Sequence, residues 1–261
     1  MKFAIKALCS FFGYEMRKAR RSGESPSFPE DSFAAQRILL QRAGIERPVI
    51  FDLGAHQGQT TARYAEIFPE GIFYCFEPFP DSFEELRKKF AADDRVKLMN
   101  LAVGKTSGKS DFFVNATSAT NSLLPRPKEA RRYYPQRAGP KTKIEVMTTS
   151  IDDFVRAEGI ERIDLLKLDI QGGELLAFQG SINTLQRLRI PILFTETMFV
   201  PHYERQPLFH EICAFLGHYG YSLFDLYHFR KANNGQLRFA DALFVHESLR
   251  RNIVDGFEAE P

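Results

Sequence analysis

Four carboxylates stand at the ends of four short apolar segments of this sequence. They are Asp52, Glu77, Asp169 and Glu196. The segments are rich in β-branched and aromatic residues, which predicts buried strands, and buried strands seldom carry acids without a purpose. In open α/β sheets, ligands bind at the carboxyl ends of the strands. We therefore expect these side chains to form a ligand site at one edge of a sheet.

The first of these segments continues into a glycine turn, in the string FDLGAHQGQTT at residues 51–61. The G-x-G-x-x-G spacing of a dinucleotide site is absent, and no Lys follows Gly58 as a Walker loop requires. Glu77, at the end of the next strand, can accept hydrogen bonds from both hydroxyls of a ribose. The pattern favours S-adenosylmethionine, with Asp52 offering negative charge to its ammonium or sulfonium end. A tight strand-to-helix turn without a ligand is the alternative.

Three further strings extend the pattern, and with it a family resemblance. They are FEPFPDSFEEL at 76–86, NLAVG at 100–104 and DLLKLDIQGGELLAFQG at 164–180. Together with the glycine turn they resemble the FkbM-type S-adenosylmethionine-dependent methyltransferases over roughly residues 48–247. That family usually has Asn where His56 stands and often Glu where Gln171 stands. The resemblance implies an α/β fold: a Rossmann-like class I methyltransferase sheet of seven mostly parallel strands, with an antiparallel C-terminal strand and helices on both faces.

The resemblance also implies an activity and a set of site residues. The expected reaction is O-methylation of a hydroxyl on a sugar, glycolipid or polyketide-type acceptor. Asp169 is the leading candidate for the chemistry, with Glu196 and His202 as candidates for the base and for acceptor contact. A divalent cation held by Asp169 and Glu196 is the less favoured alternative, and no metal ligand is assigned. The expected cofactor-binding residues are Asp52, Gly54, Ala55, His56, Gly58, Thr61, Glu77, Pro78, Asn100, Ala102, Asp169 and Gln171.

Several of these residues have plainer interpretations. Lys167, two residues before Asp169, could simply neutralise it. His202 could be an ordinary surface histidine, and Glu174 could serve only the dipole of the helix that it begins. Two other classes of function stay open: an NAD- or nucleotide-sugar-binding Rossmann-like enzyme, and a non-catalytic cofactor-binding module.

Composition sets the cellular context. The net charge of +2 over 261 residues predicts no nucleic-acid partner, and three cysteines without a C-x-x-C pair indicate a reducing, cytoplasmic compartment. The apolar start with its lysines and arginines, residues 1–21, is compatible with weak contact at a membrane surface, or with a helix that packs on the domain or a frayed tail. Homo-oligomerisation stays open. We expect an N-terminal helical extension and linker at 1–47, the methyltransferase domain at 48–247 and a tail at 248–261.

The elements that position the site follow from the apolar patterns. We expect helices at 31–43, after Gly58, from Pro80 and at 206–219, one strand at 96–103, a pair at 109–115 and 142–148, and a final antiparallel pair around the turn at 233–235. The long connection 116–141 is read either as a lid for an anionic or sugar-like acceptor or as a solvated basic loop. Its basic and aromatic residues are Arg126, Lys128, Arg131, Arg132, Tyr133, Tyr134, Arg137 and Lys141.

Overall fold

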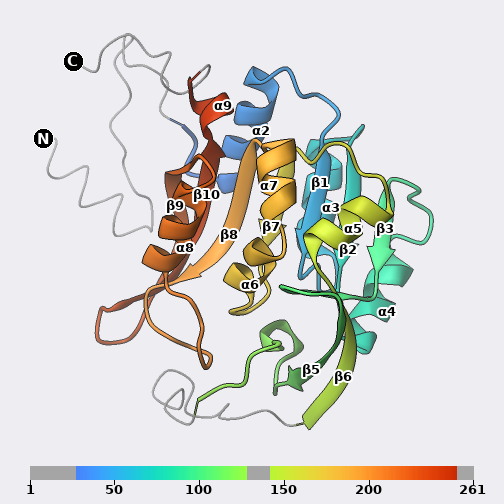
Figure 1. Ribbon diagram of the computed structural model, residues 1–261, viewed down its shortest axis with the longest axis vertical. Helices are drawn as coiled ribbons and strands as arrows, with labels where there is room; N and C mark the ends of the chain where they lie inside the picture. The colour runs from blue at the N-terminus through green and yellow to red at the C-terminus, as the bar shows by residue number, and fades with distance from the viewer. Residues whose placement is uncertain (1–27, 128–141, 252–261) are drawn as a thin grey trace, which may run out of the picture. The chain divides into compact units, whose positions relative to one another are not determined.

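The strands that carry the four acids lie together in one seven-stranded sheet (Figure 1). A computed structural model describes residues 28–127 and 142–251. The chain divides into Met1–Glu30 and Asp31–Pro261, and the fold given below is that of the second part. The expectations for residues 1–21, and for the part of the connection 116–141 that runs from Lys128 to Lys141, therefore lie outside the described ranges.

The order of the sheet is β3-β2-β1-β7-β8-β10-β9. All neighbouring pairs from β3 to β8 are parallel, and β10 runs antiparallel to both β8 and β9. This confirms the expected mostly parallel sheet with an antiparallel C-terminal strand. Its strands are β1 (Val49–Leu53), β2 (Ile72–Phe76), β3 (Val96–Met99), β7 (Leu165–Leu168), β8 (Ile192–Met198), β9 (Tyr221–Lys231) and β10 (Leu237–His246).

Helices lie on both faces of this sheet. Neighbouring residues of a strand point to opposite faces and therefore contact different helices. On one face Phe51 packs edge-on against Phe154 of α5, with ring centroids 5.9 Å apart. On the other face Asp52 accepts a hydrogen bond from Thr61 of α3. The helices are α2 (Ser32–Arg42), α3 (Gln59–Ile67), α4 (Pro80–Lys89), α5 (Ile151–Ala157), α6 (Glu174–Gln179), α7 (Ile182–Leu188), α8 (Phe209–Gly217) and α9 (Glu247–Leu249).

Local sequence explains where the first helices begin. Asp31 caps α2 by accepting a hydrogen bond from the Ala34 amide at 2.9 Å. Pro80 stands at the first position of α4, where its fixed φ suits a helix and its missing N–H costs nothing. Both starts agree with the helices expected from the sequence.

A second, three-stranded sheet has the order β4-β6-β5. It contains β4 (Ala102–Val103), β5 (Gly108–Val114) and β6 (Thr142–Thr149), and a short 3-10 helix, η1 (Ser118–Thr120), follows β5. The expected pair at 109–115 and 142–148 is confirmed as β5 and β6. The single strand expected at 96–103 is wrong, because the chain leaves the main sheet after Met99 and Ala102 pairs with Thr148 instead.

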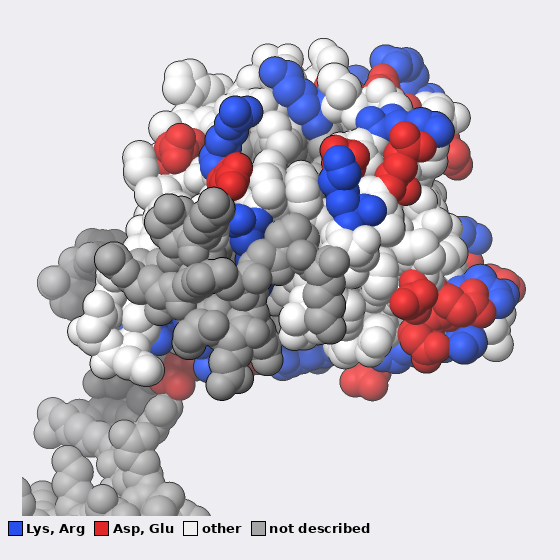
Figure 2. All heavy atoms as spheres, turned by 90° about the horizontal axis from the view of Figure 1, so that it is seen from below, with Lys and Arg blue, Asp and Glu red and all other residues white. Residues whose placement is uncertain are grey.

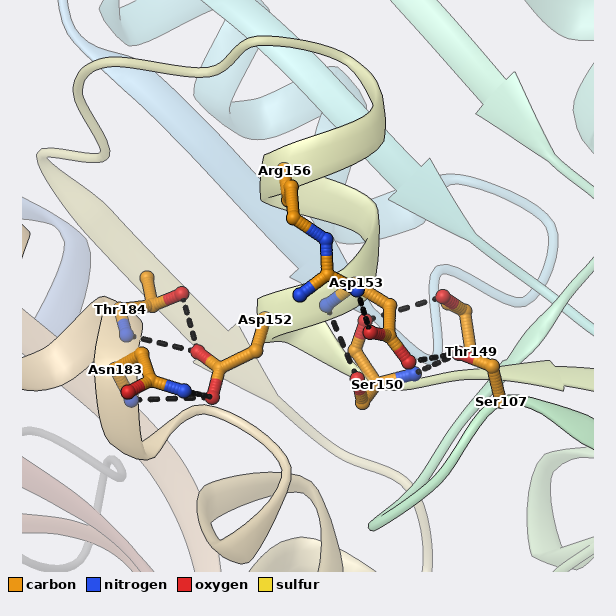
Figure 3. A network of polar contacts seen from close by, with 8 residues as sticks. All are labelled: Ser107, Thr149, Ser150, Asp152, Asp153, Arg156, Asn183 and Thr184. Atoms are coloured by element: carbon orange, nitrogen blue, oxygen red, sulfur yellow. Dashed lines mark hydrogen bonds and ion pairs between the residues drawn. The ribbon is translucent and has the colours of Figure 1, made fainter.

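A network of polar contacts ties α5 to its neighbours (Figure 3). The Asp152 carboxylate accepts hydrogen bonds from the amides of Asn183 and Thr184 at 3.0 and 2.8 Å, so it caps the start of α7. Asp153 accepts a hydrogen bond from Ser107, in the turn between β4 and β5, and pairs with Arg156. The Asp152 contacts thus join α5 to α7, and the Ser107 contact joins α5 to the small sheet.

The main apolar core lies between the sheet and helices α5 to α8, with Phe51, Leu166, Phe178 and Phe244 among its buried members. Within the described ranges, no helix has the length and apolar character needed to cross a bilayer. On the face seen from below the view of Figure 1, basic and acidic side chains of the described residues lie next to one another (Figure 2).

Candidate active site

A pocket opens at the carboxyl ends of β1, β2 and β7, where sequence analysis places a ligand site. The small sheet and the segment after β5 close it from the other side. Its walls are formed by Gly54, Ala55, His56, Gln59, Thr60, Phe76, Glu77, Pro78, Leu101, Ala102, Val103, Phe112, Ser118, Ala119, Asn121, Leu123, Lys167, Asp169, Ile170 and Gln171.

The glycine turn between β1 and α3 forms one wall of this pocket. Gly54 has φ +77°, and a Cβ atom there would lie 2.0 Å from the Asp169 carbonyl oxygen. Gly58 has φ +75°, and its Cβ would lie 2.4 Å from the ring of Phe90. Both glycines are therefore required by packing within the protein itself. His56 has φ +50°, a conformation in which Asn and His are enriched among residues with a side chain.

Asp52 is 1% exposed and does not line the pocket. Its Oδ1 lies 2.7 Å from Nζ of Lys167, the residue opposite it in the β1–β7 register, and its Oδ2 accepts a hydrogen bond from Thr61 at 2.7 Å. Lys167 also donates to the Gly54 carbonyl at 3.1 Å. The interpretation that Lys167 neutralises Asp169 is thus corrected: its ion pair is with Asp52, and the pair holds the glycine turn on β7.

Glu77 ends β2 inside the pocket and is 6% exposed. Its two carboxylate oxygens accept hydrogen bonds from the amides of His56 at 2.9 Å and Phe79 at 2.8 Å. Burial raises the pKa of Glu77 to about 7, although both hydrogen bonds act in the opposite direction. Asn100 supports this corner by donating to the carbonyls of Glu77 and Pro78.

Residues 118–123, in the first part of the connection 116–141, cover the pocket. The Ser118 hydroxyl and Nε2 of His56 lie 2.8 Å apart, which joins η1 to the glycine turn. Burial lowers the pKa of His56, so its ring is neutral near pH 7. Of the basic residues of the connection 116–141, the structure describes Arg126, which is buried and donates to the Tyr203 hydroxyl at 3.3 Å.

On the opposite side of the pocket, the amide of Gln171 connects two carboxylates. Its Nε2 donates to Oδ1 of Asp169 at 2.8 Å and to Oε2 of Glu196 at 3.0 Å. Its Oε1 accepts a hydrogen bond from the Tyr203 hydroxyl at 2.9 Å. Asp169 is exposed and lines the pocket, whereas Glu196, near the end of β8, is partly buried behind Gln171 and is not part of the pocket wall. The structure therefore brings together the two acids expected to take part in the chemistry.

Glu196 is surrounded by other acids. Burial raises its pKa well above the ordinary range, and the carboxylates of Asp169, Glu174 and Asp241 act in the same direction. Asp241 faces Glu196 across the β8–β10 pairing and lies 2.6 Å from Nδ1 of His228. A carboxylate whose pKa is raised by its surroundings is a stronger base than an ordinary carboxylate, which suits general-base chemistry.

Two other candidates have structural surroundings. Glu174 accepts hydrogen bonds from the amides of Ile170 and Gly172, so it stabilises the turn before α6 as well as facing the helix dipole. His202 is 1% exposed, which corrects the interpretation of a surface histidine. Burial, with help from Arg238 and Arg126, lowers the pKa of His202 to about 4, and the ring is not part of the pocket wall.

Eight of the expected cofactor-binding residues line the pocket: Gly54, Ala55, His56, Glu77, Pro78, Ala102, Asp169 and Gln171. The other four, Asp52, Gly58, Thr61 and Asn100, support its walls through the contacts given above. The lid interpretation of 116–141 included residues 118–123 but named none of them as a wall of the pocket, and sequence reasoning missed the part played by Tyr203. The polar run that follows β5 was the available signal for the former; nothing in the sequence pointed to Tyr203.

A group of three or more His, Cys, Asp or Glu side chains placed to hold a metal ion was not found within 28–127 and 142–251. The divalent-cation alternative thus has no such group to support it in the described part of the chain.

Comparison with known proteins gives three curated relatives. The 2-O-methyltransferase NoeI of Sinorhizobium fredii is 27% identical over 73% of this chain and 79% of its own length. The methyltransferase sdnD of Sordaria araneosa is 27% identical over 51% of this chain and 60% of its own length. The hexuronic acid methyltransferase AglP of Haloferax volcanii is 25% identical over 60% of this chain and 59% of its own length.

The family model of the methyltransferase FkbM domain matches residues 52–223 of this chain. That range is about two thirds of the chain and begins at Asp52, the acid of the first strand. It includes the glycine turn, the small sheet and the strands β7 and β8 that carry Asp169 and Glu196. The chain therefore belongs to the FkbM methyltransferase family and is a methyltransferase.

Proposed function

We propose that this methyltransferase transfers the methyl group of S-adenosylmethionine to a hydroxyl group of a sugar-type acceptor. The observation that carries the proposal is the pocket at the carboxyl edge of the sheet, where Glu77 and Asp169 face one cavity and Gln171 joins Asp169 to Glu196. The names of the relatives NoeI and AglP, a 2-O-methyltransferase and a hexuronic acid methyltransferase, support an oxygen nucleophile on a sugar.

The residues of the pocket fit the cofactor. Each Glu77 oxygen already accepts one backbone N–H and keeps a second lone pair, so the carboxylate can also accept from two ribose hydroxyls. Asp169 offers a negative charge to the cationic amino acid part, and Leu101 and Ala102 offer apolar surface to the base. When bound, S-adenosylmethionine supplies an electrophilic methyl group on a positively charged sulfur.

Glu196 is our choice for the proton acceptor. As the acceptor oxygen forms its bond to the methyl carbon, the carbon–sulfur bond breaks, and the hydroxyl proton must leave the oxygen. Burial and three neighbouring acids raise the pKa of Glu196, so its ionised form is a stronger base than an ordinary carboxylate. Asp169, two residues from Gln171 and exposed in the pocket, then serves the cofactor side.

The test has two parts. Isothermal titration of the purified protein with S-adenosylmethionine, S-adenosylhomocysteine and NAD should show binding of the first two, and Glu77→Ala should weaken both by about 1.5 to 3 kcal/mol, the scale of charged hydrogen bonds. A deuterated methyl group on the cofactor should then appear in a panel of hexoses, deoxyhexoses and hexuronates. Binding of NAD in place of the two adenosyl compounds would refute the proposal.

A further inference from the structure

We propose that Gln171 is a positioning residue of the methyl-transfer reaction, whose side-chain amide holds Asp169 and Glu196 together as a working pair of carboxylates. The inference rests on the proposed function, because it concerns the groups that we assign to cofactor binding and proton removal. It gives Gln171 a part in the chemical step, in place of the cofactor contact expected from its position.

The contacts around Gln171 use every polar atom of its side chain. Both N–H groups have carboxylate acceptors, Asp169 at 2.8 Å and Glu196 at 3.0 Å, and the oxygen accepts from Tyr203 at 2.9 Å. An amide turned by 180° would present its oxygen to two carboxylates and its N–H groups toward the Tyr203 hydroxyl. The two carboxylates therefore select this orientation, and the Tyr203 hydroxyl, which can donate or accept, is compatible with it.

The backbone of Gln171 is held as firmly as its side chain. Its φ of +56° is uncommon for a residue with a side chain, and its carbonyl accepts a hydrogen bond from the Ser122 hydroxyl at 2.7 Å. Tyr203 also lies within hydrogen-bonding distance of the Thr120 carbonyl, at 2.9 Å. The segment that covers the pocket and the loop after β8 thus converge on one residue, as is common where backbone strain serves a site.

An amide suits this place because it adds two donors without adding charge. The charged groups that act on Glu196 are Lys167 from β7, Asp169 directly after β7, Glu174 from α6 and Asp241 from β10. Asp241 is itself paired with His228 of β9. Three of the four direct neighbours are acids, which favour a protonated Glu196. The Gln171 N–H opposes them by hydrogen bonding to the charged form, and so keeps the base available.

The role predicts a change in the pH dependence of kcat. Ionised Glu196 is the active form, so kcat should rise with pH through the pKa of Glu196 and level off above it. Gln171→Met keeps the length of the side chain and removes both donors. We expect it to move this acid limb upward by about one pH unit, the size that the loss of a hydrogen bond to a charged group implies.

Three more variants complete the set. Gln171→Glu is nearly isosteric and adds a third acid, so its limb should move further than that of Gln171→Met. Tyr203→Phe removes the hydroxyl that contacts the amide oxygen and leaves both carboxylate contacts of Gln171 in place, so a smaller shift in the same direction is expected. Gln236→Glu makes the same chemical change at an exposed turn between β9 and β10 and should leave the limb where it is.

The experiment measures single-turnover methyl transfer between pH 5 and 9 with saturating cofactor and acceptor. Unaltered limbs in Gln171→Met and Gln171→Glu, with kcat lowered by the same factor at every pH, would overturn the inference, because that is the behaviour of a purely structural residue. A wild-type rate that does not change with pH would overturn it too. A wild-type protein that transfers no methyl group to any acceptor, while it binds no adenosyl compound, would instead refute the proposed function.

Discussion

Replacing Lys167 by Met should destabilise the protein strongly, because it leaves Asp52 as a buried charge without its cation. Asp52 and Lys167 are 1% and 5% exposed and lie 2.7 Å apart. Breaking a buried pair by removing one partner typically costs about 3–5 kcal/mol. Asp52 keeps its hydrogen bond from Thr61, so we expect the lower end, about 3 kcal/mol in the free energy of unfolding.

Urea denaturation at pH 7 measures this loss, and a double-mutant cycle isolates the pair. The double variant Asp52→Asn, Lys167→Met should lose about 2 kcal/mol less free energy of unfolding than the sum of the two single changes. Each single change leaves one buried charge without its partner, whereas the double variant leaves none. Lys109→Met is the matched control: its ion pair with Glu145 is as short, at 2.6 Å, but both side chains are more than 60% exposed, and no measurable change is expected. Additive single effects, or a wild-type urea midpoint in Lys167→Met, would refute the reasoning.

Three more predictions concern the walls of the pocket. Gly54→Ala should lower the free energy of unfolding, measured by thermal unfolding, by at least about 2 kcal/mol, because the new Cβ collides with the Asp169 carbonyl. Gly44→Ala is the control: Gly44 has a similar positive φ but no atom within 4 Å of the new Cβ, so only the backbone strain of about 1 kcal/mol is expected. Burial raises the pKa of Glu77 from 4.5 to about 7 in the folded protein, so the stability that it contributes is full below about pH 4.5 and is lost as pH rises through 7. Between pH 4.5 and 8, the free energy of unfolding of Glu77→Gln should therefore fall by about 3 kcal/mol less than that of the wild type, as read from urea midpoints. Asp169→Asn should weaken S-adenosylmethionine binding by about 10-fold or more in isothermal titration and leave the single-turnover rate at saturating cofactor close to wild type, because we assign this carboxylate to the cofactor; a loss of about 10²-fold in that rate would place its charge in the chemical step instead.

Much of the sheet could be predicted from local patterns, because a buried strand must be apolar and must end where a turn begins. Asp52, Glu77, Asp169 and Glu196 were expected at one edge for that reason, and they lie there. The break between Met99 and Ala102 could not be predicted in the same way. Both halves of that segment are apolar, and only pairing with β6, more than 40 residues further on, decides that the second half joins another sheet.

Contacts across the sheet were equally hidden. Lys167 is two residues from Asp169 in the sequence, which suggested that pair, yet the β1–β7 register places Lys167 opposite Asp52, more than 100 residues away. A parallel register is set by the whole of two strands and their crossover, and the string around either residue does not contain it. The part played by Tyr203 was hidden for the same reason, since the loop after β8 meets Gln171 only in the folded chain.

The four acids at this edge began as equivalent candidates, and their surroundings make them different. Asp52 is neutralised by Lys167, and Glu77 is held by two backbone amides while it keeps lone pairs for a ligand. Asp169 and Glu196 share the two N–H groups of a single neutral amide. A neutral donor lowers the cost of placing two acids together without removing their charge, whereas a lysine in the same place would have fixed both as ion pairs. In this chain Gln171 therefore holds the two acids together and, on our proposal, leaves Glu196 able to accept the proton of the acceptor hydroxyl.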